Sequence, residues 1–136
     1  MFKTILFPVD MSPEAQQAAS LAAELVNAHQ SKLVIVSVVE AANAAHPAAH
    51  PQQTSTEAVA ALLNKVKALF ADKGIDCQTI EREGQPAFAI CDVADEINAD
   101  LIVMGCRGVG LIEEAQDESV TNRVINLSPC PVLVVP

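Results

Sequence analysis

A glycine-rich loop in the last third of the chain carries residue types suited to binding an anion. It reads Met104-Gly105-Cys106-Arg107-Gly108-Val109-Gly110 and directly follows a short apolar run. Glycines allow backbone N–H groups to turn inward and approach a phosphate closely. Ser119, Val120 and Thr121 stand at a predicted helix start, where backbone N–H groups, the helix dipole and side-chain hydroxyls add further donors. Together these residues predict a phosphate-binding turn.

A purely structural turn remains the alternative for this loop. Many glycine loops that follow a strand only reverse the chain direction. The pattern GxxxxGK[ST] is absent, and GxGxxG does not follow the first predicted strand. The residues alone therefore leave phosphate binding and a simple tight turn as equal alternatives.

Apolar runs and helical patterns alternate along the whole chain and predict the elements that position this loop. Continuous apolar strands separated by amphipathic helices predict a parallel sheet covered on both faces. Ligands of such sheets bind beyond the carboxyl ends of the strands, which here carry Asp10, Val39 and Gly105. The predicted strands are Thr4–Val9, Leu33–Val39, Ile75–Arg82, Leu101–Met104 and Val132–Val135.

Local signals mark the ends of the intervening helices. Gly74 predicts the left-handed end of the second helix. Val120, Val124 and Leu127 are expected to lie on one side of the last helix. Helix starts are predicted at Ser12-Pro13, at the capping box Thr54-x-x-Glu57, at Gly84-Gln85-Pro86 and at Ser119.

Length and charge restrict the class of protein. The 136 residues predict one domain over residues 1–136, and no apolar run approaches the ~18 residues of a membrane-spanning helix. The first residues lack the core and cleavage site of a signal peptide, so we expect a soluble, cytoplasmic protein. The net charge is −9 and the basic residues are scattered, which argues against nucleic acid and membrane surfaces as partners.

The four cysteines predict buried thiols. They form no CxxC pair and lie in or beside apolar segments, where free cysteine packs like a small hydrophobic residue. Cys106 is a partial exception because it falls in the glycine loop. The other three are Cys77, Cys91 and Cys130.

A histidine doublet occupies the irregular stretch between the second strand and the second helix. His46 and His50 belong to the repeat AAHP-AAHP at Ala44–Pro51, where proline forbids a helix. No third ligand type is nearby, so we expect a mobile loop and no metal site.

Four segments, taken in order, resemble one known family along essentially the whole chain. They are Val9-Asp10-Met11-Ser12, Gly84-Gln85-Pro86, the run from Ala99 to Gly108, and the ending from Ser128 to Val135. In this order and spacing they are similar to a single-domain universal stress protein. The expected fold is a three-layer α/β/α, doubly wound sheet of five parallel strands in the order 3-2-1-4-5, Rossmann-like and of the adenine nucleotide alpha hydrolase type.

The resemblance implies a nucleotide-binding motif with one departure. Members that bind ATP carry G-x2-G-x9-G-[ST]; Gly105, Gly108 and Ser119 match it, whereas Glu118 replaces the third glycine. The resemblance also implies that Pro8, Val9 and Asp10 contact adenine and ribose, with Asp10 on the ribose hydroxyls. Val38 or Val39 would flank the base. Met104, Gly105, Arg107, Gly108, Ser119, Val120 and Thr121 would hold the phosphates.

Glu118 has two expected consequences for the nucleotide. A left-handed backbone at this position costs roughly 1–2 kcal/mol more for Glu than for Gly. A carboxylate ~6 Å from a unit charge repels it by roughly 0.7 kcal/mol in water-like surroundings. We therefore expect AMP or ADP to be tolerated better than ATP. A bound Mg²⁺ reverses this expectation if the acidic side chains ligate it.

Two main functions remain open, and an enzyme is a minor third. The first is an adenine-nucleotide-binding module of stress signalling; the second is a nucleotide-free homodimeric interaction protein. A slow ATPase is less favoured, since no catalytic triad, paired catalytic carboxylates or Walker lysine is identifiable. In either main case the apolar last strand, Val132–Val135, predicts an isologous homodimer, because an exposed strand edge must be covered or paired.

Overall fold

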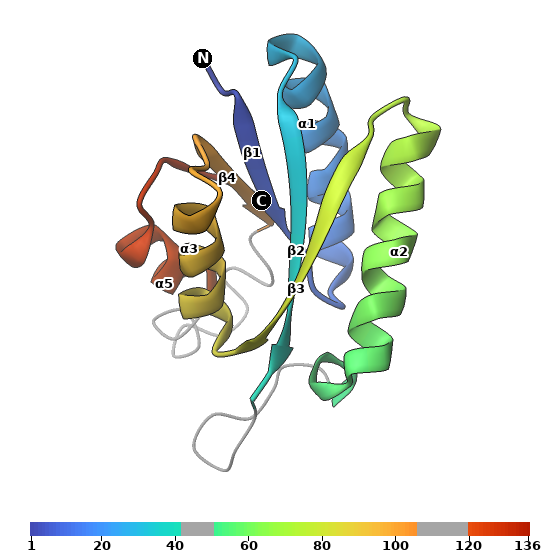
Figure 1. Ribbon diagram of the computed structural model, residues 1–136, viewed down its shortest axis with the longest axis vertical. Helices are drawn as coiled ribbons and strands as arrows, with labels where there is room; N and C mark the ends of the chain where they lie inside the picture. Colours follow the sequence, from blue (N-terminus) through green and yellow to red (C-terminus); the bar gives the residue numbers. More distant parts are fainter. Residues whose placement is uncertain (42–50, 106–119) are drawn as a thin grey trace.

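The computed structural model describes residues 1–41, 51–105 and 120–136, and a parallel sheet lies at its centre (Figure 1). The sheet has five strands in the order β3-β2-β1-β4-β5, which confirms the predicted topology. All neighbouring strands run parallel. The strands are β1 (Thr4–Pro8), β2 (Lys32–Glu40), β3 (Cys77–Gly84), β4 (Leu101–Gly105) and β5 (Val132–Val135).

Helices cover both faces of the sheet, so the domain has the three layers that the sequence predicted. On one face lie α1 (Pro13–His29) and α2 (Thr56–Asp72). On the other lie α3 (Pro86–Glu96) and α5 (Val120–Leu127) (Figure 1). A short 3-10 helix, η1 (Pro51–Thr54), precedes α2 and was not predicted.

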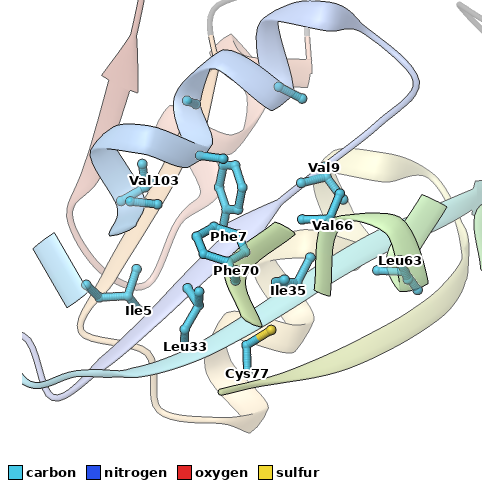
Figure 2. Close-up of a cluster of buried hydrophobic side chains, with 14 of the residues drawn as sticks. Ile5, Phe7, Val9, Leu33, Ile35, Leu63, Val66, Phe70, Cys77 and Val103 are labelled. Atoms are coloured by element: carbon cyan, nitrogen blue, oxygen red, sulfur yellow. The ribbon is translucent and has the colours of Figure 1, made fainter. Parts of the chain in front are cut away.

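The central strands are apolar throughout because each of them faces two cores. Ile5 and Phe7 of β1 pack toward α1 and α2, whereas Leu6 packs toward α3 and α5. Phe7 meets Phe70 of α2 edge to face, with the ring centroids 5.8 Å apart (Figure 2). A strand buried on both sides shows a continuous apolar run rather than alternation.

β2 extends beyond its neighbour β1 at the carboxyl end. The last register pair joins Pro8 to Val36, and the Val9 N–H donates to the Val36 C=O at 2.8 Å. β2 continues from there to Glu40. Its final residues therefore reach past the end of β1.

The start of α2 differs from the sequence prediction, whereas its end agrees with it. The capping box at Thr54 is wrong: Ser55 is the N-cap, and its hydroxyl accepts the Ala58 N–H at 3.2 Å. Thr54 is the last residue of η1, so its backbone already belongs to a different helix. Gly74 has a φ of +78°, and its N–H donates to the Ala71 C=O at 2.9 Å, which confirms the predicted left-handed end.

One further expectation needs correction at the edge of the sheet. The third strand begins at Cys77 rather than Ile75, because the Ile75 N–H bonds the Phe70 C=O and so closes the end of α2. On α5, Leu127 is 46% exposed. The buried face of α5 is centred on Thr121 and Val124, and Leu127 falls at its margin.

The three described cysteines are free thiols. Cys77 and Cys91 are buried, which confirms the prediction for both, and Cys130 is half-buried. Burial raises the pKa of each thiol above its ordinary value. Cys106 lies outside the described residues.

Candidate functional site

A pocket opens at the carboxyl ends of β1, β2 and β4. This is where the chain connections change sides, because β1 leads through α1 to β2 on one side and β3 leads through α3 to β4 on the other. Such a switch point is where open α/β sheets bind their ligands. The described residues that line the pocket are Pro8, Val9, Asp10, Ser12, Ala15, Val36, Val38, Glu40, Gln53, Pro86, Ile90, Met104, Gly105, Val120 and Thr121.

Asp10 lies in the turn between β1 and α1, and this turn fixes the position of its carboxylate. Asp10 Oδ1 accepts the Ser12 N–H at 2.8 Å and also the Ser12 hydroxyl. The same hydroxyl accepts the Ala15 N–H at 3.4 Å and so caps α1, as predicted. One serine therefore both caps the helix and bonds the carboxylate.

Val38 and Val39 lie on opposite faces of β2. Val38 packs with the core under α3 and α5 and lines the pocket beside Ile90 and Met104. Val39 packs in the core under α1 and α2 and is not among the lining residues. Since side chains alternate along a strand, only one of the two can face the pocket, and the structure places Val38 there.

Gln53 joins three segments at the wall of the pocket. Its Nε2 donates to the Ser37 Oγ at 3.1 Å and to the Val38 C=O at 2.7 Å. Its Oε1 accepts the Met11 N–H at 3.2 Å. The end of β2 and the turn that carries Asp10 are thus bonded to the same buried amide.

The fourth strand meets the start of α5 on the remaining side of the pocket. The Thr121 hydroxyl donates to the Gly105 C=O at 3.1 Å. Thr121 is buried, and Val120 is half-buried. Gly105, where the predicted glycine turn begins, therefore lies close to Thr121 at the predicted helix start.

Among the described lining residues, the charged side chains are both acidic. Asp10 and Glu40 supply the two carboxylates, and no Lys or Arg lines this part of the pocket. Arg107, the cation that the sequence places in the glycine loop, lies outside the described residues. The described wall is suited to groups that donate hydrogen bonds, such as hydroxyls and amines.

The described residues form neither a metal-ligand cluster nor a membrane-spanning helix. Within residues 1–41, 51–105 and 120–136, no three His, Cys, Asp or Glu side chains gather as a metal ion requires. His46 and His50 lie outside these ranges. The helices of the same three ranges are too short or too polar to cross a bilayer.

Comparisons with known proteins decide the family. The model of the universal stress protein family matches residues 1–136. The universal stress protein Sll1654 of Synechocystis sp. is 60% identical over 136 residues, which is 100% of this chain and 87% of the relative. The chain belongs to the universal stress protein family.

Solved structures of the family share the fold at lower identity. A universal stress protein in complex with cAMP superposes with a TM-score of 0.80 at 23% identity, over 99% of this chain and 97% of the other. A family protein from Arabidopsis thaliana with AMP bound gives a TM-score of 0.69 at 18% identity, over 98% and 90% of the two chains.

In this universal stress protein, most residues predicted for the site converge on one pocket. Val39 is outside it, for the reason given above. Arg107, Gly108, Glu118 and Ser119 lie outside the described residues. The residues brought together are Pro8, Val9, Asp10, Val38, Met104, Gly105, Val120 and Thr121.

Several lining residues were not predicted from the sequence. Pro86 was assigned to the start of α3, and Ser12 to the start of α1, but neither was assigned to the site. Gln53 carried no signal, because its partners Met11 and Val38 lie 42 and 15 residues away along the chain.

Proposed function

We propose that this universal stress protein binds an adenine nucleotide in the pocket at the ends of β1, β2 and β4. The observation that supports this most is the convergence of residues from four separate segments of the chain on that one pocket. Two proteins of the same fold were solved with cAMP and with AMP, which share the adenosine group.

The proposed arrangement follows the chemistry of the walls. The base packs against Val38 and the apolar end of β1, at Pro8 and Val9, because these side chains are apolar. The Asp10 carboxylate accepts the ribose hydroxyls. The phosphates lie toward Gly105 and Thr121, where the glycine loop leaves β4 and α5 begins.

The proposal extends to the choice of nucleotide. Glu118 replaces the third glycine of the motif, and Glu113, Glu114 and Asp117 add charge to the same loop. Since these charges oppose the β and γ phosphates, AMP and ADP bind better than ATP in the absence of metal. Mg²⁺ changes that order if the acidic side chains ligate it.

The role we propose is that of a signalling module of the stress response rather than an enzyme. The chain offers an adenosine pocket without an identifiable catalytic triad or Walker lysine. It acts in the cytoplasm as a homodimer joined through β5, and its occupancy reports on the adenine nucleotide pool.

The first test is chemical. Purified protein, denatured after extensive washing, is expected to release material with adenine absorbance, or to bind added AMP by calorimetry. Calorimetry with AMP, ADP and ATP, each with and without Mg²⁺, then ranks the ligands. Metal-free ATP binding much tighter than AMP contradicts the charge argument and leaves nucleotide binding intact.

A nucleotide-free interaction protein is the second candidate. The acidic character of the described pocket wall favours it, because Asp10 and Glu40 repel an anionic ligand. Its surface includes apolar side chains on α5 and β5 that remain exposed, namely Ile125, Leu127 and Leu133. Protein that neither carries adenine nor binds AMP, ADP or ATP supports this candidate instead.

A further inference from the structure

Gln53 makes three hydrogen bonds at the wall of the pocket. Only 2% of its surface is exposed. Both N–H groups of its amide are used, one on the Ser37 hydroxyl and one on the Val38 C=O, and its oxygen accepts the Met11 N–H. A buried amide bonded on both sides holds a fixed orientation, because breaking any of its bonds leaves a buried polar group unsatisfied.

Two backbone groups of opposite polarity set which way this amide faces. The Val38 C=O can only accept a hydrogen bond, and the Met11 N–H can only donate one. Rotation of the amide by half a turn would place its NH₂ against the Met11 N–H and its oxygen against the Val38 C=O. Gln53 therefore has one allowed orientation between the two segments.

The strand geometry places this amide at the wall of the site, where β1 ends. The Val36 C=O accepts the Val9 N–H, so the Val38 C=O, two residues later, points to the same side of β2. β1 has ended at that level. The Gln53 side chain therefore donates to the Val38 C=O where the backbone of a longer β1 would otherwise do so. The side chain thus links the end of β2 to the turn that follows β1.

We propose that Gln53 is a positioning residue for the nucleoside half of the pocket. It sets the separation between the Val38 wall and the turn Asp10–Ser12, and so places the Asp10 carboxylate for the ligand. Gln53 acts through this turn and need not touch the ligand. The inference rests on the proposed function, since it assigns Asp10 to the ribose.

The test is a double-mutant cycle on AMP affinity measured by calorimetry. Gln53→Met keeps the approximate length of the side chain and removes all three hydrogen bonds. We expect it to weaken AMP binding about tenfold, the size of one well-placed hydrogen bond. Asp10→Asn weakens binding as well, and the double variant should lose little more than Asp10→Asn alone, because the position of an absent carboxylate no longer matters.

Two controls separate positioning from a general loss of stability. Val66→Ala truncates a buried residue of α2 that is not itself among the lining residues of the pocket, lowers the melting temperature, and should combine additively with Asp10→Asn. Gln78→Met makes the same replacement at an exposed position of β3 and should leave AMP affinity unchanged. Circular dichroism and thermal melting confirm that each variant is folded.

Each outcome supports or overturns the inference. Additive losses for Gln53→Met and Asp10→Asn overturn it, as does Gln53→Met with unchanged affinity. Tighter AMP binding by Gln53→Met also overturns it, because the amide would then compete with the base for the Val38 C=O. If the wild type binds AMP and the cycle is additive, only this inference fails; if the wild type binds no adenine nucleotide, the proposed function fails with it.

Discussion

In the proposed nucleotide site, Glu118 takes the place of the third glycine in the motif G-x2-G-x9-G-[ST], and glutamate differs from glycine there in two physical respects. It adds a negative charge near the expected phosphates, and it raises the cost of a left-handed backbone. The two effects are separable by substitution, because glutamine removes the charge alone and glycine removes both.

We expect Glu118→Gln to raise metal-free ATP affinity about threefold, which corresponds to roughly 0.7 kcal/mol of repulsion removed. Glu118→Gly should raise it by roughly a further five- to thirtyfold, if the bound loop requires the left-handed backbone whose cost is about 1–2 kcal/mol. AMP lacks the β and γ phosphates, so its affinity should change little. Calorimetry at low and at moderate ionic strength measures both effects.

Salt provides the internal control for this series. The gain from Glu118→Gln should shrink as ionic strength rises, because screening reduces the repulsion that the substitution removes, whereas the backbone gain from glycine persists. An equal rise of AMP and ATP affinity in both variants would show that position 118 acts on the whole site and not on the distal phosphates.

At the scale of the element, the start of α1 joins stability to ligand binding through Ser12. Its hydroxyl caps the helix at the Ala15 N–H and bonds the Asp10 carboxylate. Ser12→Ala should lower the free energy of unfolding by about 1 kcal/mol, the usual value of such a cap. It should also weaken AMP binding roughly three- to tenfold, since Asp10 loses a donor that orients it. Urea unfolding and calorimetry measure the two quantities.

Ser55 offers a matched control on α2. Its hydroxyl caps the helix at the Ala58 N–H, and it does not line the pocket. Ser55→Ala should cost a similar free energy of unfolding and leave AMP affinity close to wild type. If both alanine variants bind AMP equally well, the bond from Ser12 to Asp10 has no part in the site.

The elements show which features the sequence predicts and why others escape it. The apolar runs of β1 and β2, the cap at Ser12 and the end at Gly74 follow from residues within a few positions of one another. The start of α2 was one residue off, because Thr54 and Ser55 are both good caps and only the preceding turn of η1 decides between them. Local patterns cannot report such a competition.

The site was predictable where a strand end or a glycine turn marks it, and not where distant segments meet. Asp10 and Gly105 follow apolar strands, so their position beyond the carboxyl edge could be inferred. Val38 could not be chosen over Val39 until the register of β2 fixed which face each of them occupies. Gln53 reaches Met11 across 42 residues, a contact that only the folded topology creates.

At the scale of the whole molecule, the two edges of the sheet differ in character. β3 is mostly polar and exposed, which suits an edge that meets water. β5 reads Val-Leu-Val-Val, and Leu133 in it is 36% exposed. Leu127 and Ile125 on the neighbouring α5 are also exposed. A second copy of the chain, related by a two-fold axis, would cover this apolar edge.

We therefore expect the protein to sediment at micromolar concentration with about twice the 14.3 kDa mass of the chain. Leu133→Lys should give a monomer that remains folded, because the side chain is already partly exposed and a lysine at a strand edge opposes pairing. The wild type should also show a melting temperature that rises with protein concentration, as expected when association stabilises the folded chain, and the variant should not.

Thr79→Lys makes the matched change on β3, at the opposite edge of the sheet, and should leave the dimer intact. A dimer that survives Leu133→Lys must use another surface, and a wild-type monomer at these concentrations would leave the apolar edge without its proposed partner. Because the pocket lies at the ends of β1, β2 and β4 and not at β5, the monomeric variant should still bind AMP. Dimer formation and ligand binding can thus be tested apart in one protein.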